Sequence, residues 1–179
     1  MALNMTRRQF LISIGVALFA LLLGVLSSRY LSQFGFSRDP AVTEVFKKEW
    51  FDPNQTKLDT QEWGGKVLIL NFWATWCPPC VEEMPVLDQI QKEFGKQKLL
   101  IVGIGIDSPS NIRQFLEKTP ISYPVALGGL EGSQIAKSLG NAQGGLPFTV
   151  VINQNGKIQG RKLGKISEDE LRSFIKQAN

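Results

Sequence analysis

Residues 70–80 read LNFWATWCPPC and join an apolar run to a pair of cysteines. Cys77 and Cys80 are the only two cysteines in the chain of 179 residues, and two residues separate them. This spacing lets the two sulfur atoms meet across the first turn of a helix, where unpaired backbone N–H groups and the helix dipole favour the thiolate form of a cysteine. Because the thiolate is the form that attacks disulfides, the pair indicates thiol–disulfide exchange.

Other uses of such a cysteine pair fit this chain less well. A structural zinc site takes about four nitrogen or sulfur ligands, and the chain has two cysteines and no histidine. Covalent c-type haem requires a histidine directly after the second cysteine, where this chain has Val81. A plain stapling disulfide gains little closure entropy across so short a loop. We predict no cofactor and no metal site, although Cu(I) binding by the two thiolates, helped by Met84, stays open as a function of another class.

Residues 1–29 are predicted to form a membrane segment. Residues 9–28 carry no charge, and the almost wholly apolar run 10–26 is roughly 26 Å long as a helix, close to the thickness of a hydrocarbon core. Arg7 and Arg8 precede the run, which favours a cytoplasmic N-terminus.

We expect an uncleaved anchor rather than a cleaved signal peptide. The apolar run exceeds a typical signal-peptide core, and no A-x-A site follows it. Residues 6–11, TRRQFL, also resemble a twin-arginine export signal, and the alternative is a pair of arginines that only sets the topology.

The charge balance argues against a nucleic-acid partner. The chain has 20 lysines and arginines and 16 acidic residues, but Arg7, Arg8 and Arg29 lie at the membrane segment. From Tyr30 onward 17 basic residues face 16 acidic ones, a net charge of +1. So small a charge provides no field that attracts nucleic acid.

Residues 30–55 are predicted to form a tether and a docking helix, ahead of a domain over residues 56–179. Asp39 suits the cap of a helix that begins at Pro40. Apolar residues follow at helical spacing, namely Val42, Val45, Phe46 and Trp50.

The domain alternates strands with helices. Residues 67–73 form an unbroken apolar run, which is typical of a strand buried on both faces. The helix after the cysteines, over 81–94, has Glu82 and Glu83 in its first turn, where the dipole favours them, and Pro85 should kink it. Further strands are predicted at 99–106, 123–127, 148–152 and 157–162, and further helices at 111–118, 131–139 and 168–177. This order predicts an α/β fold with a mixed sheet flanked by helices.

The chain resembles proteins of the thioredoxin fold and, more narrowly, the TlpA/ResA-like family of membrane-anchored thiol-disulfide oxidoreductases. The resemblance runs from about residue 56 to residue 179 and rests on residues 70–80, on Glu83-Met84-Pro85 and on residues 145–152, GLPFTVVI. The strand and helix expected between residues 108 and 140 match the insertion that this family carries in the middle of the thioredoxin fold.

The resemblance implies roles for individual residues. Cys77 is expected to be the nucleophile and Cys80 the resolving cysteine. Trp76, Leu146 and Pro147 are expected to bind substrate, with Pro147 as a cis proline against the cysteine pair and the backbone of Leu146 pairing with an extended substrate strand. The family usually has Thr or Ser after this proline, where this chain has Phe148.

A base for Cys80 is predicted at Asp107. Plain thioredoxin has a buried Asp where this chain has Asn71, whose amide does not take a proton at neutral pH. The family instead has an acidic residue at the end of the next strand, which aligns with Asp107. A buried carboxylate there has a raised pKa and can deprotonate Cys80. The alternative is a helix-capping role for Asp107.

We expect the protein to reduce disulfides. Pro78-Pro79 removes two N–H donors that otherwise stabilise a Cys77 thiolate, and the chain has no histidine, so the reduction potential is expected toward the thioredoxin end of the range. The resemblance implies a bacterial inner-membrane protein with a periplasmic catalytic domain. Its implied partners are disulfide-containing envelope proteins, as in apocytochrome c maturation, and a membrane electron donor. A thiol oxidant or isomerase of the same fold stays open as the alternative.

Overall fold

The computed structural model describes residues 20, 21, 24 and 38–178. The chain divides into two units, Met1–Phe36 and Ser37–Asn179. Among the described residues, no helix is both long enough and apolar enough to cross a membrane. Apart from residues 20, 21 and 24, the predicted anchor over residues 1–29 lies outside the described residues.

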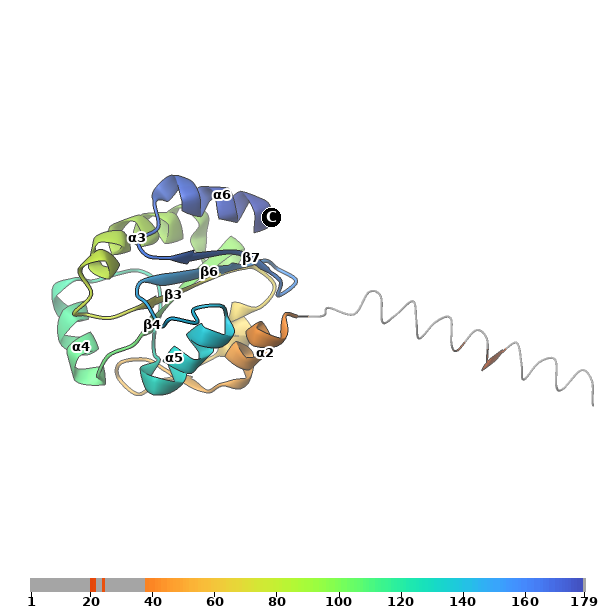
Figure 1. Ribbon diagram of the computed structural model, residues 1–179, viewed down its shortest axis with the longest axis horizontal. Coiled ribbons are helices and arrows are strands. Elements are labelled where there is room, and N and C mark those ends of the chain that lie inside the picture. The colour runs from red at the N-terminus through yellow and green to blue at the C-terminus, as the bar shows by residue number, and fades with distance from the viewer. Residues whose placement is uncertain (1–19, 22–23, 25–37, 179) are drawn as a thin grey trace, which may run out of the picture. The chain divides into compact units, whose positions relative to one another are not determined.

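A five-stranded mixed sheet forms the centre of the second unit, in the order β5-β4-β3-β6-β7 (Figure 1). Its strands are β3 (Val67–Trp73), β4 (Leu99–Gly105), β5 (Val125–Leu127), β6 (Phe148–Ile152) and β7 (Ile158–Leu163). Strands β3, β4 and β5 run parallel, whereas β6 is antiparallel to β3 and β7 is antiparallel to β6. The predicted α/β fold with a mixed sheet is confirmed.

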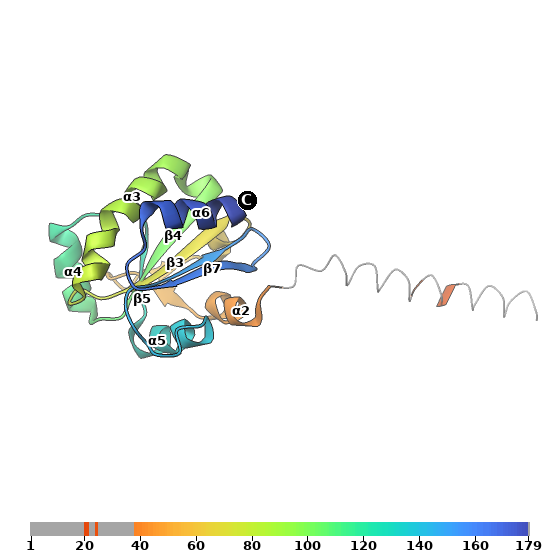
Figure 2. The same cartoon turned by 45° about the horizontal axis from the view of Figure 1, so that its top comes forward.

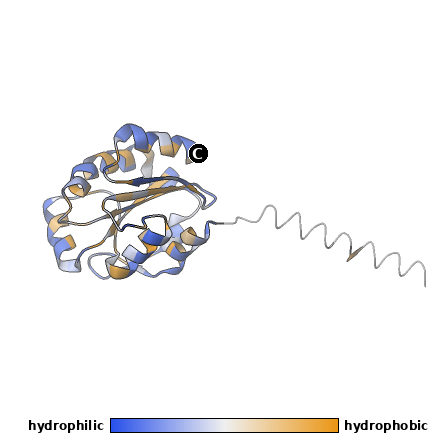
Figure 3. Cartoon of the chain, in the orientation of Figure 1, coloured by the Kyte–Doolittle hydropathy of each residue, from blue (hydrophilic) through white to orange (hydrophobic). Residues whose placement is uncertain are grey.

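Helices cover both faces of this sheet (Figures 1 and 2). Helices α3 (Pro78–Lys98) and α6 (Glu168–Ala178) lie on one face, and α2 (Pro40–Lys47) and α5 (Gly129–Ser138) lie on the other, while α4 (Pro109–Lys118) packs beside α3. All seven residues of β3 are buried, as predicted for a strand with both faces covered. Figure 3 shows hydrophobic and hydrophilic residues interspersed along the helices, as expected where one side of each helix packs on the sheet.

A helix, α2, lies where the sequence predicts the docking helix. Asp39 caps it by accepting the Ala41 N–H at 2.9 Å, and Val42 and Val45 are fully buried. The sequence pattern also places Trp50 on this helix, which is wrong, because Trp50 begins strand β1. Its indole Nε1 donates to the Val45 carbonyl at 2.8 Å, so the side chain stays in the core. The connection to β3 contains three short elements, β1 (Trp50–Phe51), β2 (Lys57–Leu58) and the 3-10 helix η1 (Thr60–Trp63).

Helix α3 begins earlier than its sequence pattern indicates. Cys77 is the N-cap, so the first turn contains Pro78, Pro79 and Cys80 and no acidic residue. The predicted placement of Glu82 and Glu83 in the first turn is therefore wrong. Pro85 lies inside α3, where a kink was predicted. The residue of α3 whose dihedral angles are non-helical is Gly95 instead, at φ 68° and ψ 154°, and the kink of the helix lies there.

The side chain of Gln91 closes an open edge of the sheet. Strand β5 pairs with residues 103–105 of β4, and among residues 38–178 no strand pairs with the first half of β4 on that side. From α3, the buried Gln91 donates from Nε2 to the Leu99 carbonyl at 3.1 Å and accepts the Ile101 N–H on Oε1 at 2.7 Å. Because buried backbone groups need partners, the Gln91 amide supplies the donor and the acceptor that a neighbouring strand supplies elsewhere in the sheet.

Replacing Gln91 by Leu is expected to lower the free energy of unfolding by about 2–4 kcal/mol, because a buried carbonyl and a buried N–H lose their partners. Urea unfolding measures the change. Gln97→Leu, at an exposed position of the same helix, is the matched control and is expected to change stability by no more than about 0.5 kcal/mol. Equal effects of the two substitutions would contradict this role for Gln91.

Candidate active site

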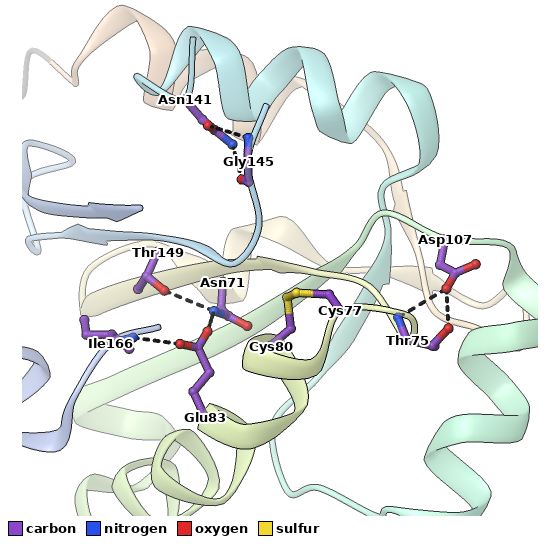
Figure 4. The surroundings of a disulfide bond; sticks show 10 residues. All are labelled: Asn71, Thr75, Cys77, Cys80, Glu83, Asp107, Asn141, Gly145, Thr149 and Ile166. Carbon is purple, nitrogen blue, oxygen red and sulfur yellow. Dashed lines mark hydrogen bonds between the residues drawn. A yellow bond between two sulfur atoms is a disulfide. The ribbon is translucent and has the colours of Figure 1, made fainter. Parts of the chain in front are cut away.

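Cys77 and Cys80 form a disulfide at the N-terminus of α3 (Figure 4). Their Cα atoms lie 5.3 Å apart, and the N–H groups of Cys80 and Val81 donate to the Cys77 carbonyl at 3.1 and 3.2 Å. Cys77 is 4% exposed and Cys80 is fully buried. A partner therefore reaches the sulfur of Cys77 first, which supports its predicted role as the nucleophile.

The peptide bond between Leu146 and Pro147 is cis, as predicted. Strand β6 begins at the next residue and runs antiparallel to β3, so its start lies beside the end of β3, four residues before Cys77. Leu146 packs against the apolar cluster that contains both cysteines. Phe148, which replaces the usual Thr or Ser, is buried on the other face of the sheet with its ring centroid 5.9 Å from that of Phe72. Its ring is thus part of the core beneath α2 and α5.

Asn141 holds the loop that leads to Pro147. Its Nδ2 donates to the Gly145 carbonyl at 2.8 Å, and its Oδ1 accepts the Gly145 N–H at 3.1 Å (Figure 4). Both backbone groups of Gly145 are thereby fixed just before Leu146, the residue predicted to pair with substrate. Sequence reasoning missed Asn141, because its partners are backbone groups and no motif marks them.

Trp76 presents the largest exposed apolar side chain beside the disulfide. Its side chain is 66% exposed and directly precedes Cys77. Leu163, at the end of β7, is 48% exposed and lies over Gly145, where an added Cβ would come within 3.0 Å of it. One exposed apolar side chain therefore lies beside the cysteines, and another lies beside the loop that leads to Pro147. Substrate binding by Trp76, Leu146 and Pro147 stays a prediction.

Glu83 is a buried carboxylate one helical turn after Cys80. Its Oε1 accepts from Asn71 Nδ2 at 2.7 Å, and its Oε2 accepts the Ile166 N–H at 2.8 Å (Figure 4). Burial raises the pKa of Glu83 above its ordinary value, and the two hydrogen bonds and Lys165 offset only part of that effect. A buried acid with a raised pKa beside a reactive pair is a candidate functional residue.

Sequence reasoning missed the role of Glu83, although a signal existed. The residue follows Cys80 by three positions and precedes Leu87 by four, which places it on the buried face of the helix. Ile166, its backbone partner, lies just before a capping box at the start of α6. In that box Ser167 N–H donates to Glu170 Oε2 at 3.1 Å and Glu170 N–H donates to Ser167 Oγ at 3.3 Å.

Asp107, the predicted base, is engaged elsewhere. One carboxylate oxygen accepts from the backbone N–H and the hydroxyl of Thr75, and the other accepts from Ser108 N–H at 2.7 Å and Asn111 Nδ2 at 2.8 Å. Partial burial opposes them, but these hydrogen bonds lower the pKa of Asp107 below its ordinary value. The raised pKa predicted for Asp107 is therefore wrong. Its carboxylate ties the Thr75 loop to the start of α4, whose N-cap is Ser108, and its role as a base stays a prediction.

The chain matches the Redoxin family over residues 40–176.

This chain belongs to the Redoxin family.

Named relatives and solved structures agree with this assignment. This chain is 29% identical over 115 residues to the thiol-disulfide oxidoreductase ResA of Geobacillus thermodenitrificans. The aligned residues cover 64% of this chain and 64% of that relative. A thioredoxin-related protein from Neisseria meningitidis serogroup B is 36% identical, with 73% of this chain and 98% of that one covered and a TM-score of 0.65. A thiol:disulfide interchange protein from Chlorobium tepidum is 28% identical, with 73% and 92% covered and a TM-score of 0.65. The predicted thioredoxin-like fold and the family resemblance are confirmed.

The raised pKa of Glu83 predicts a pH dependence of stability in this Redoxin-family protein. Above pH 4.5, the ordinary pKa of the group, the unfolded chain has released a proton that the folded protein still holds. The free energy of unfolding therefore falls as pH rises toward the raised pKa. Glu83→Gln removes this titration, so the stability difference between wild type and variant is expected to shrink as pH rises from 4.5.

Chemical unfolding across pH 4–8 measures that difference. Thr149→Val is the control, because it removes a hydrogen bond of Asn71 Nδ2 and keeps the Glu83 carboxyl, so its difference from wild type is expected to stay flat. A flat difference for Glu83→Gln as well would contradict the raised pKa.

Proposed function

We propose that this protein is a thiol–disulfide oxidoreductase that reduces disulfides in proteins of the bacterial envelope. The observation that carries the proposal is the Cys77–Cys80 disulfide at the start of α3, close to the loop of cis Pro147 and next to the exposed Trp76. Membership of the Redoxin family and the relatives named as thiol-disulfide oxidoreductases support the same chemistry.

The reaction proceeds by two exchanges of a sulfur–sulfur bond. The Cys77 thiolate attacks one sulfur of the substrate disulfide, which forms a mixed disulfide and releases the other substrate sulfur as a thiolate that takes up a proton. Cys80 then attacks the Cys77 sulfur, closes the Cys77–Cys80 disulfide and releases the reduced substrate. Two electrons pass from the dithiol to the substrate. We assign Glu83, one helical turn from Cys80, as the acceptor of the Cys80 proton, and Asp107 is the alternative base.

Two features of the site favour reduction over oxidation. Pro78 and Pro79 occupy the first two positions of α3, so neither offers an N–H to a Cys77 thiolate. The carboxyl of Glu83 is buried nearby, and a negative charge there disfavours a second one on sulfur. Because a less stable thiolate makes a stronger reductant, these features support our proposal of a reduction potential toward the thioredoxin end of the range.

We infer a membrane-anchored, periplasmic location from the N-terminal sequence. The uncharged run over residues 9–28, preceded by Arg7 and Arg8, supports an anchor with the C-terminal domain outside the cytoplasm. A reductant in an oxidising compartment needs its electrons replaced, so the proposal includes a membrane electron donor. Maturation of apocytochrome c, which requires reduced cysteines, is the envelope pathway that we propose.

Trapping of mixed disulfides tests the proposal. In Cys80→Ser the first exchange proceeds and the second does not, so covalent adducts through Cys77 are expected to accumulate in cells and to disappear on reduction. Cys77→Ser is the matched control and is expected to trap little. Adducts that form only with Cys77→Ser would reverse the assignment, and an absence of adducts from both variants would reject the proposed reductase.

The hydrogen bonds of Asn141 predict a loss that is specific for protein substrates. Asn141→Asp keeps an acceptor for the Gly145 N–H and loses the donor to its carbonyl, so the Leu146 backbone is less well fixed. We expect kcat/KM with a protein disulfide to fall roughly three- to tenfold, the equivalent of one hydrogen bond. Oxidation of the dithiol by a small aromatic disulfide, which does not need the loop, is expected to stay within about twofold.

Asn153→Asp is the matched control for this substitution. Asn153 lies in the turn before β7, where its side-chain oxygen accepts from the N–H groups of Asn155 and Lys157 at 3.0 and 2.9 Å. It is expected to leave both rates unchanged. An equal loss for protein and small disulfides in Asn141→Asp would show that Asn141 acts on the cysteines rather than on substrate binding.

A further inference from the structure

The amide of Asn71 is held in one orientation. Its side chain is fully buried, and both N–H donors of Nδ2 are used, to Glu83 Oε1 at 2.7 Å and to Thr149 Oγ1 at 3.0 Å. The carboxylate of Glu83 accepts only, so the nitrogen of the amide must face it. The oxygen is therefore turned to the other side by contacts that do not involve the cysteines.

The oxygen of this amide has no hydrogen-bond partner. Asn71 Oδ1 is one of the buried side-chain atoms among the described residues for which none is found. In Figure 4 the nitrogen lies toward Thr149 and Glu83, and the oxygen points toward the side where Cys80 lies. Trp73, two residues further along the same face of β3, packs in the cluster that contains both cysteines. The unpaired oxygen thus belongs to the floor of the active site.

An unpaired buried carbonyl is unfavourable and calls for a physical reason. In the disulfide state neither sulfur carries a proton, so the cysteine pair has no hydrogen-bond donor for this oxygen. When a dithiol donor reduces the pair, two electrons and two protons enter, the sulfur–sulfur bond breaks and Cys80 becomes a thiol. A thiol S–H is a hydrogen-bond donor, although a weak one.

We propose that Asn71 Oδ1 accepts the thiol proton of reduced Cys80, directly or across one bound water. The inference rests on the proposed thiol–disulfide exchange and deepens it. Asn71 is then a positioning residue that keeps the proton on Cys80 while Cys77 attacks the substrate. Its nitrogen holds Glu83 at the same time, so a single amide connects the carboxylate to the resolving cysteine and stabilises the dithiol relative to the disulfide.

The equilibrium with glutathione tests this proposal. In that equilibrium the protein disulfide and two glutathione thiols exchange with the protein dithiol and glutathione disulfide. Asn71→Leu removes the unpaired oxygen from the disulfide form and the acceptor from the dithiol form, and both changes favour the disulfide. We expect the equilibrium constant to move toward the disulfide roughly three- to tenfold, the equivalent of one hydrogen bond.

Thr149→Val is the matched control for this measurement. It removes a partner of the Asn71 nitrogen and keeps the oxygen, so its equilibrium constant is expected to stay within about twofold of wild type. A shift of the same size in Thr149→Val would overturn the proposal, because the effect would then follow from any change in this network. An unchanged constant in Asn71→Leu would overturn it too, because Cys80 would then donate elsewhere, for example to a carbonyl of its own helix.

A measurement on the wild-type protein decides the question if Asn71→Leu does not fold. The carbon-13 signal of the Asn71 side-chain carbonyl is expected to move on reduction with dithiothreitol. The same signal of Asn141 is the internal reference, because its oxygen already accepts the Gly145 N–H in the disulfide form. An Asn71 signal that moves no more than that of Asn141 would overturn the proposal. The proposed reductase fails by a different result, the absence of trapped adducts in Cys80→Ser.

Discussion

The central position of β3 is the constraint on which the site depends. This strand has β4 on one side and β6 on the other, and both of its faces are covered, so neighbouring elements enclose it on every side. It ends at Trp73, and α3 begins only five residues later, which fixes the two cysteines at that end of the sheet. Because β6 runs antiparallel to β3, its first residue lies at the same end. Strand pairing therefore brings Pro147 to the end of the sheet where the cysteines lie, and its carbonyl also accepts the Gly164 N–H at 2.8 Å.

A small buried polar network connects this end of the sheet to the rest of the domain. Asn71 of β3 donates to Glu83 of α3 and to Thr149 of β6. The N–H of Ile166, in the segment before α6, donates to Glu83. A buried carboxylate is costly unless donors satisfy it, so these elements must meet in one arrangement. The same requirement that fixes the packing of α3 on the sheet also sets the charge near the sulfurs. Stability and redox chemistry thus share residues in this protein.

The two carboxylates near the site show why position along the chain was a poor guide to their roles. Asp107 follows a buried strand, yet four donors around it lower its pKa and tie it to Thr75 and the start of α4. Glu83 has the pattern of a helix-terminus acid only if the helix begins at residue 81. The true start at Pro78 moves Glu83 out of the first turn, and it is fully buried. Three residues of helix are most of a turn, so a small error in the boundary decides whether a side chain lies in the first turn, beside the free N–H groups, or beyond it.

The sequence by itself determined what local patterns encode. The apolar run of β3, the spacing of Cys77 and Cys80 and the apolar spacing of α2 each predicted a feature that the structure contains. The cis bond before Pro147 was implied by the family resemblance. Tertiary structure alone decided the partners of Asn71, Gln91 and Asn141. An amide carries both a donor and an acceptor, and its role depends on which backbone and side-chain groups are left unpaired around it. Those groups come from elements far apart in the chain or from loop geometry, so they exist as partners only after the sheet and helices have assembled.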